Sequence, residues 1–292
     1  MSRRLAVIVN PTAGAGRARE ALPRVRAELE RAEADFEILE TTSAEHAREE
    51  GAAARERGDT VGALGGDGLV GTLAGVLSGG ESPLAVLPGG RGNDLARVLG
   101  IPTEPEAAAR VAVDGSERAI DVPTVDGRSY VGIASCGFDS DANRIANDAR
   151  LVRGNLVYLY AALRALAAWR PATFEVTVDG EPHRVTGYSV IVANSKAYGG
   201  GMYVVPHAQL DDGRLDVMLS SSGSKLHFLR NLPKLFNGSH VDDPRIQFLS
   251  GTTVEVTADR PFAVYADGDP IGELPVRITV APRALRVLVP GA

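Results

Sequence analysis

Cysteine is nearly absent from this chain of 292 residues, since Cys136 is the single one and no intramolecular disulfide can form. Chains without disulfides are typical of reducing compartments, so we expect a cytoplasmic protein. Long apolar runs are also lacking. The run at residues 156–163 stops at Arg164, well short of the roughly 20 residues that a membrane-spanning helix needs.

Lysine is scarce, since it occurs only at Lys196, Lys225 and Lys234, and basic charge is therefore almost all arginine. The phosphate-binding motif GxxxxGK[ST] does not occur. A formal net charge of −6 argues against nucleic acid as a partner and against bulk attraction to anionic lipid, although a local arginine patch could still bind a membrane surface. The apolar pentamer at residues 5–9 is too short for a signal-peptide core, so we expect a strand there.

The most informative stretch is residues 60–77. A strand-length apolar run at 61–64 ends in Gly65-Gly66-Asp67-Gly68, and apolar residues then recur at helical spacing. Such a glycine turn brings backbone N–H groups and a helix N-terminus close to a phosphate. A carboxylate beside a polyphosphate is repelled unless a divalent cation lies between them, so Asp67 indicates a metal–nucleotide loop.

The first half of the chain alternates strands and helices. Strands are predicted at residues 5–9, 35–41, 61–64 and 84–87, and helices at 17–34, 44–57, 69–77 and 95–99, with Ser43 as an N-cap. This order predicts a parallel α/β sheet in which the loops at 10–16, 65–68 and 88–94 meet at one edge.

From about Ile120 the pattern changes to short strands separated by Asp-Gly and Gly-Gly turns. Strands are predicted at 130–135, 173–178, 184–193, 214–219, 252–257, 262–266 and 276–280, with helices at 141–169 and 225–236. We therefore expect an α/β nucleotide-binding domain at residues 1–121, followed by an antiparallel, β-sandwich-like lipid-binding domain at 122–292. The pattern leaves open whether residues 283–292 return to the first domain. An unpaired sheet edge in the second domain would permit a homodimer.

The run from Gly66 to Gly71 also fits the dinucleotide pattern GxGxxG. Hydride transfer is disfavoured, because Asp67 would face the pyrophosphate unscreened and the next strand ends without an acidic residue for a ribose. Each glycine turn alone is more simply structural. Three such loops in one domain, two of them with an aspartate, favour a nucleotide site.

The chain resembles the diacylglycerol kinase catalytic-domain family, which includes bacterial lipid kinases and the sphingosine and ceramide kinases. The resemblance lies in the three loops at residues 10–14, 65–68 and 87–97, in the glycine turn and Asp-Asp-Gly-x-Leu-Asp-Val segment at 199–217, and in Asp267-Gly268-Asp269. Since these motifs occur in order over nearly the whole chain, they are more specific together than Gly-Gly-Asp-Gly, which NAD kinases share.

The resemblance implies ATP and Mg²⁺ as cofactors and assigns residues to them. For ATP it implies Asn10, Pro11, Thr12, Ala13, Gly14, Thr41, Thr42, Gly65, Gly66, Asp67, Gly68, Leu69, Val70, Gly71, Arg91 and Asn93. Asp67, Asp94 and Asp121 would organise a catalytic magnesium through water, and Asp269 would be the general base. A second, structural magnesium is implied at Asp212 with the backbone near Gln209 and Arg214.

Three residues depart from the family pattern. Leu69 and Arg91 each stand where the family commonly has a threonine, and Arg91 could supply a guanidinium for phosphate instead. Asp269 stands where the family usually has a glutamate. Without the resemblance, residues 267–269 would be predicted as a hairpin turn, because Asp-Gly pairs favour turns. Residues 211–213 are as consistent with a solvated turn as with a metal site, and Asp121 could simply pair with an arginine.

These observations predict an ATP- and magnesium-dependent lipid kinase, peripheral at the inner face of the membrane, that phosphorylates the hydroxyl of diacylglycerol or a similar lipid. Two alternatives stay open. One is NAD-kinase-like phosphorylation of a soluble nucleotide, and the other is a nucleotide-binding protein without turnover.

Overall fold

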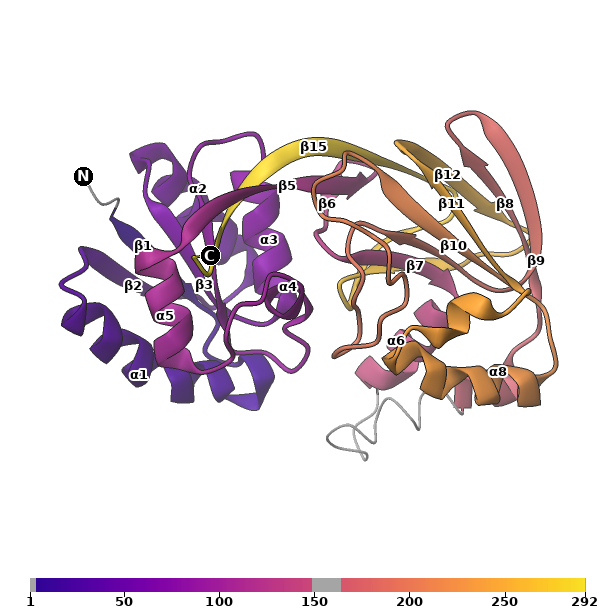
Figure 1. Cartoon of the computed structure of the whole chain (residues 1–292), viewed down its shortest axis with the longest axis horizontal. Coiled ribbons are helices and arrows are strands. Elements are labelled where there is room, and N and C mark those ends of the chain that lie inside the picture. The colour runs from indigo at the N-terminus through magenta and orange to yellow at the C-terminus, as the bar shows by residue number, and fades with distance from the viewer. Residues whose placement is uncertain (1–3, 149–163, 292) are drawn as a thin grey trace.

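Figure 1 shows the computed structural model of the chain, which describes residues 4–148 and 164–291. Two halves lie side by side, one built from parallel strands and helices and the other mainly from antiparallel strands. The predicted fold class, an α/β domain followed by an antiparallel, sandwich-like one, is confirmed. Among the described residues, no helix has both the length and the apolar character needed to cross a bilayer.

Four parallel strands form the centre of the first half, in the order β4-β3-β1-β2. Their bounds are β1 Leu5–Val9, β2 Phe36–Glu40, β3 Thr60–Gly65 and β4 Leu84–Pro88. Val9 pairs with Leu64, and Gly65 pairs with Pro88. The register therefore brings the loops that follow β1, β3 and β4 to the same edge of the sheet.

The helices of this half cover the sheet in two pairs, α1 against α5 and α2 against α3. Their bounds are α1 Arg17–Arg31, α2 Ala44–Arg57, α3 Asp67–Leu77, α4 Asp94–Val98 and α5 Pro105–Asp114, with a 3₁₀ turn at Ala13–Ala15. Helix α2 begins where the sequence predicts, because the Ser43 hydroxyl accepts a hydrogen bond from the His46 N–H at 3.1 Å.

The second half is an antiparallel array in the order β14-β13-β7-β9-β8-β12-β15, with β10 and β11 added beside β9. The strands are β6 Arg128–Ser129, β7 Ile133–Gly137, β8 Ala172–Val178, β9 Glu181–Ala193, β10 Leu215–Ser221, β11 Ile246–Gly251, β12 Thr253–Ala258, β13 Ala263–Ala266 and β14 Asp269–Glu273. Its helices are α6 Phe138–Asp148, α8 Lys225–Asn231 and the 3₁₀ turns η2 Leu232–Phe236 and η3 Ser239–Asp242.

Two long antiparallel strands connect the halves, β5 (Ser116–Val125) and β15 (Val276–Val289) (Figure 1). One end of β15 pairs with β12 in the second half, and its other end reaches β4, where Val287 pairs in parallel with Leu84. The final apolar run at 285–289 thus pairs with β4 and with residues 116–120 of β5, and it packs in the core of the first half.

Three predicted elements differ from the observed ones. The strand expected at 130–135 begins only at Ile133, because the preceding backbone N–H groups donate to the Asp267 carboxylate. The helix expected at 225–236 changes to a 3₁₀ turn after Asn231, because Pro233 has no N–H to continue the α-helical pattern. Of the helix expected at 141–169, α6 is the first part, residues 164–168 are helical again, and 149–163 lie outside the described residues.

Candidate active site

A cavity of about 920 Å³ lies where the loops of the first half face those of the second. Its walls come from both halves of the chain. The lining residues are Asn10, Pro11, Thr12, Ala13, Gly14, Thr41, Thr42, Ser43, Ala44, Ala47, Gly66, Asp67, Gly68, Leu69, Thr72, Gly90, Arg91, Gly92, Asp94, Leu95, Val131, Gly132, Ala197, Tyr198, Gly199, Gly200, Met202, Phe236, Asp267, Gly268 and Asp269. Most residues predicted to bind ATP are among them.

The loop after β1, residues 10–16, is shaped by its own side chains. Oδ1 of Asn10 accepts hydrogen bonds from the backbone N–H and the hydroxyl of Thr12, at 3.2 and 2.8 Å. Gly14 has φ of 61°, and a Cβ atom there would lie 2.5 Å from the carbonyl oxygen of Gly89. Only glycine therefore permits the first loop to pack this closely against the third.

Helix α3 points its N-terminus into the cavity. Among the described residues, no side chain caps its first turn. Its N-cap, Gly66, and its residue Gly68 both line the cavity, so that no side chain of theirs holds a ligand away. A helix N-terminus of this kind attracts anions, because its backbone N–H groups and its dipole both favour negative charge.

Asp67 lies in the first turn of α3 and holds the loop after β4 by hydrogen bonds. Its carboxylate accepts hydrogen bonds from the N–H groups of Asn93 and Asp94, at 2.9 and 2.8 Å. Burial and the nearby Asp94 carboxylate raise the pKa of Asp67, against the lowering effect of these hydrogen bonds. A cation here would relieve the repulsion between the two carboxylates.

Asp94 links the two halves across the cavity. Both of its carboxylate oxygens lie within hydrogen-bond distance of the Gly200 N–H, at 3.1 and 3.0 Å. Gly200 belongs to the triple glycine at residues 199–201, each of which has positive φ. The glycines let this turn bring a backbone N–H to the carboxylate.

Of the two cavity acids in the second half, Asp267 is the one that backbone N–H groups hold in place. Its carboxylate accepts hydrogen bonds from Val131, Gly132 and Ile133, at 2.9, 3.0 and 3.0 Å. Burial, together with the negative charge of Asp67, raises the pKa of Asp267 to about 7 despite these hydrogen bonds.

Asp269 lies beside the N-terminus of α3. A Cβ atom at Gly68 would come within 2.6 Å of Oδ2 of Asp269, so only glycine leaves room for this carboxylate. Partial burial raises the pKa of Asp269, which is the right direction for a group that must take up a proton. Two acids from each half, Asp67 and Asp94 with Asp267 and Asp269, thus surround one cavity.

Several predicted site residues do not line this cavity, namely Gly65, Val70, Gly71, Asn93, Asp121, Gln209, Asp212 and Arg214. Asn93 supports the third loop instead, because its Oδ1 accepts the Gly90 N–H at 2.9 Å. Thr41 lines the cavity, but its hydroxyl donates to the carbonyl of Val9.

Asp121 does not line the cavity with these four acids. It is fully buried, and its two carboxylate oxygens accept the N–H groups of Gly213 and Arg283, each at 2.7 Å. Asp121 therefore joins β5 to β15 and to the loop before β10. The family resemblance implied a role for Asp121 at the catalytic magnesium, but Asp121 lies within β5, which runs on to Val125.

The donor set around the cavity fits magnesium shared with a nucleotide. All four acids offer hard oxygen ligands, which Mg²⁺ prefers. Within residues 4–148 and 164–291, no three His, Cys, Asp or Glu side chains converge into a closed metal cage. Mg²⁺ typically takes one or two carboxylates, waters and substrate phosphates, and this open arrangement suits it. At the predicted second site, Oδ1 of Asp212 accepts the Arg214 N–H at 3.0 Å, and a magnesium there stays a prediction.

Four residues of the cavity had no predicted role in the site, namely Asp267, Tyr198, Met202 and Phe236. The Asp-Gly-Asp segment at 267–269 could have indicated Asp267, because it also contains Asp269. The triple glycine at 199–201 could have indicated a close approach of its backbone to another part of the chain. Phe236 gave no signal, because an aromatic residue in a predicted helix reads as core.

Comparisons with known proteins agree along the whole chain. Residues 4–125 match the family model of the diacylglycerol kinase catalytic domain, and residues 132–289 match that of the YegS C-terminal NAD kinase beta sandwich-like domain. The resemblance stated from the motifs is thereby confirmed.

The chain is 36% identical to a diacylglycerol kinase of Mycobacterium tuberculosis, with 98% of this chain and 95% of that protein covered. It is 32% identical to a probable lipid kinase YegS-like of Pseudomonas aeruginosa, over 79% of this chain and 76% of the other. A crystal structure of a diacylglycerol kinase from Bacillus anthracis has the same fold, with a TM-score of 0.77 at 23% identity and 99% and 97% of the two chains covered.

A first prediction concerns Asp121. Asp121→Asn replaces one of two buried acceptors by an amide that cannot accept, and we expect the free energy of unfolding to fall by roughly 2 kcal/mol or more. Asp126→Asn is the matched control, because Asp126 makes a similar but exposed contact with the Arg277 N–H. We expect this control to cost less than about 1 kcal/mol in chemical denaturation. Equal costs for the two variants would contradict a special role of Asp121 in the fold.

A second prediction concerns pH. Because the pKa of Asp267 is raised to about 7 from an ordinary 3.8, folding favours its protonated form, and this contribution to stability is lost as the pH rises through 7. In metal-free buffer, the unfolding free energy of the native chain should therefore fall relative to that of Asp267→Asn between about pH 4 and pH 8. Denaturation at several pH values measures this, and a constant difference would show that Asp267 does not titrate there.

Proposed function

The chain belongs to the diacylglycerol kinase family of lipid kinases, and from this premise we propose that it transfers the γ-phosphoryl group of ATP to the hydroxyl of diacylglycerol or a similar lipid, with Mg²⁺, at a membrane surface. The observation that carries this proposal is the cavity between the halves, in which two pairs of aspartates surround the N-terminus of a helix.

The first half would bind ATP. The glycine turns at residues 14, 66, 68, 90 and 92 leave the backbone close to the cavity, and the first turn of α3 offers N–H groups to the phosphates. Arg91 is exposed at the cavity wall and would add a guanidinium to them. Mg²⁺ bound together with ATP would neutralise the phosphate charge beside Asp67 and Asp94.

The second half would bring in the lipid hydroxyl. Asp269 lies against Gly68 in the first turn of α3, so a hydroxyl beside this carboxylate would also face the γ-phosphate. The carboxylate takes the hydroxyl proton as the oxygen attacks the γ-phosphorus, the bond from that phosphorus to the bridging oxygen breaks, and ADP leaves. Asp267 anchors residues 131–133 to the hairpin that carries Asp269 and thus positions the base.

The test is a transfer assay with labelled ATP and a panel of lipids in mixed micelles, with magnesium and with a chelator. We expect a phosphorylated lipid that appears only with the metal. Incubation with NAD in place of lipid tests the soluble-nucleotide alternative, and calorimetric ATP binding without any product would support a protein without turnover. A folded protein that phosphorylates no lipid would overturn the proposal.

Removal of the proposed base gives a sharper prediction. Asp269→Asn should lower the turnover rate by about 10²–10⁴-fold, because it loses the proton acceptor, while ATP affinity in calorimetry stays close to that of the native chain. Asp269→Glu restores a carboxylate and should retain much more activity.

Glu273→Gln is the matched control, since Glu273 is an exposed acid on the same strand, β14, and does not line the cavity. It should leave the rate unchanged. A near-native rate in Asp269→Asn would remove Asp269 from the role of base.

A further inference from the structure

Four large hydrophobic side chains are exposed together in one segment of the second half. Leu226 and Leu229 on α8 are 59% and 36% exposed, Phe236 at the end of η2 is 60% exposed, and Val241 on η3 is 38% exposed. Among the described residues, no other large hydrophobic side chain is as exposed. We call this surface, together with the exposed Lys225, Arg230 and Lys234 beside it, the α8 face.

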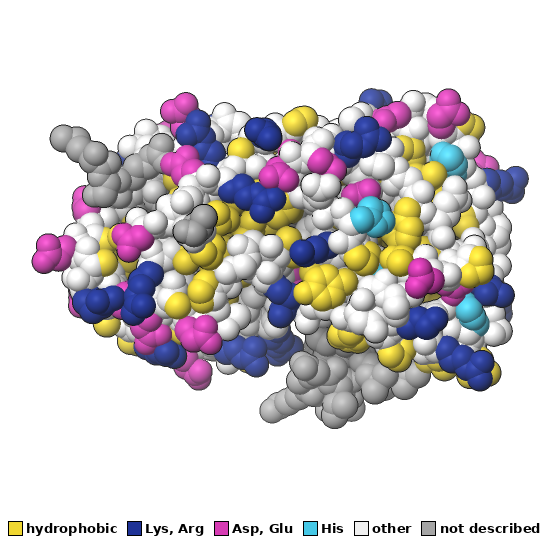
Figure 2. All heavy atoms as spheres, viewed as in Figure 1, with side chains coloured by type: hydrophobic (Ala, Val, Ile, Leu, Met, Phe, Trp, Pro, Cys, Tyr) yellow, Lys and Arg dark blue, Asp and Glu magenta, His cyan; other side chains and the backbone are white. Residues whose placement is uncertain are grey.

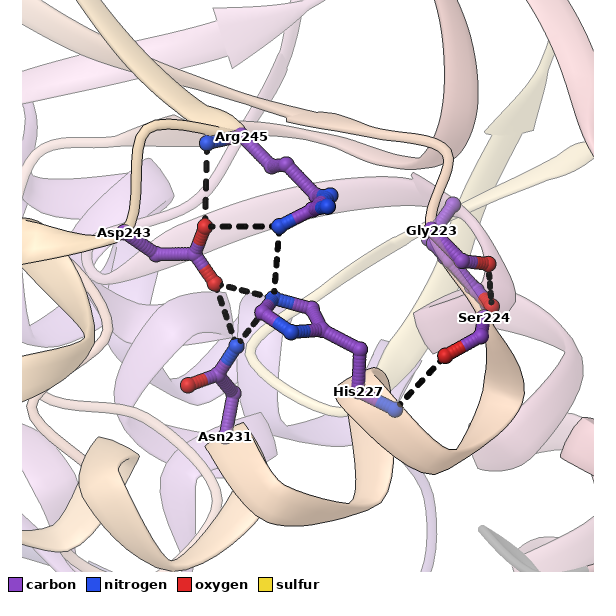
Figure 3. Close-up of polar contacts among 7 residues, drawn as sticks. Gly223, Ser224, His227, Asn231, Asp243 and Arg245 are labelled. Atoms are coloured by element: carbon purple, nitrogen blue, oxygen red, sulfur yellow. Dashed lines mark hydrogen bonds and ion pairs between the residues drawn. The ribbon is translucent and has the colours of Figure 1, made fainter.

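The inner side of α8 is held by polar contacts, which Figure 3 shows, and by Phe228, whose ring packs against Phe138 and Tyr188. His227 and Asn231 both bind the Asp243 carboxylate, whose side chain is only 4% exposed, and the Arg245 N–H donates to the same carboxylate at 3.0 Å. The Ser224 hydroxyl caps the helix by accepting from the His227 N–H at 3.1 Å. Since this inner side is fixed against the protein, the leucines on the other side face outward.

The exposure of both leucines is unusual for a helix in water, because surface helices normally bury their large apolar side chains. The start of α8 is also anchored to the rest of the protein. Besides the Asp243 contacts, Nζ of Lys225 donates to the Ala167 carbonyl at 2.7 Å and ties the start of α8 to the preceding helix. A held and outward-facing apolar surface marks an interaction site.

The charge of the α8 face identifies its partner. Residues 225–236, which form α8 and η2, contain Lys225, Arg230 and Lys234 and no Asp or Glu, although the whole chain carries a formal net charge of −6. Two of the three lysines of the chain lie in this segment. The next acids along the chain are the exposed Asp242 and Asp243, whose carboxylate is held by His227 and Asn231. In Figure 2 the region of α8 shows Lys and Arg side chains next to hydrophobic ones. Apolar side chains ringed by cations match a bilayer with anionic headgroups.

The α8 face is also continuous with the active-site cavity, because Phe236 belongs to both. A bilayer resting on Leu226, Leu229 and Phe236 would thus lie at the mouth of the cavity that contains Asp269. A second copy of the chain fits less well, since two such faces in contact would bring Lys and Arg against Lys and Arg.

We propose that the α8 face is the surface by which this protein docks on an anionic lipid bilayer, so that the acceptor lipid enters the cavity past Phe236. This inference rests on the proposed lipid-kinase function and names the face that serves it. The docking itself needs neither ATP nor turnover and can be measured separately.

The experiment is flotation of the full chain with vesicles, without nucleotide, on phosphatidylcholine mixed with phosphatidylglycerol and on phosphatidylcholine alone. Arg230→Gln with Lys234→Gln should weaken binding to the anionic vesicles by about 30-fold and flatten its dependence on salt. Leu226→Ser with Leu229→Ser should weaken it by about tenfold or more, because less apolar surface enters the bilayer. Thermal unfolding confirms that each variant is folded.

Arg19→Gln with Arg26→Gln is the matched control, since it removes the same charge from exposed positions on α1. This control should bind vesicles as the native chain does. Short-chain diacylglycerol dissolved as monomers separates docking from catalysis: the α8-face variants should phosphorylate it at the native rate, and should lose activity only on diacylglycerol within vesicles.

Native affinity of both α8-face variants for anionic vesicles would overturn the proposal. So would a native chain that binds no vesicles and forms a dimer which Leu226→Ser with Leu229→Ser dissociates, because a second copy would then cover the face. If the native chain binds vesicles through this face but phosphorylates no lipid, monomeric or embedded, the docking stands and the kinase function fails.

Discussion

Hydrogen bonds from backbone N–H groups to aspartate carboxylates hold this site together. Asp67 binds the loop before α4, Asp94 reaches Gly200 in the other half, and Asp267 holds residues 131–133. Burial removes water from Asp67 and Asp267, and the N–H groups compensate for part of that loss. The same acids that assemble the cavity walls therefore supply its negative charge, which makes the site complementary to a metal-bound nucleotide.

The sequence predicted the elements whose signals are local. The glycine loops after β1, β3 and β4 follow apolar runs, and parallel strands bring such loops to one edge. The position of Asp121 depended on contacts with Gly213 and Arg283, which lie far away in the sequence. The extent of β15 was equally out of reach, because its two ends pair with strands of different halves and no local pattern specifies both.

The orientation of α8 shows a second limit of sequence patterns. Helical spacing groups Leu226 with Leu229 and His227 with Asn231, but it does not say which group faces the protein. The usual assumption buries the leucines. Asp243, twelve residues beyond Asn231, offers a buried partner to His227 and Asn231, and Phe228 packs against Phe138 and Tyr188, so the leucines are left outside. Contacts outside the helix thus determine which side chains the surface presents.

The paired strands between the halves affect how the molecule can open. A single linker would act as a free pivot, but β5 and β15 form a hydrogen-bonded ribbon, and relative motion must bend or twist it. The register of the ribbon shifts between Ala281 and Leu285, and Arg283 there has φ of 50°. At this interruption of the pairing, the Asp121 carboxylate accepts the Arg283 N–H at 2.7 Å. A buried acid outside the cavity therefore braces the ribbon where its own ladder of hydrogen bonds is broken.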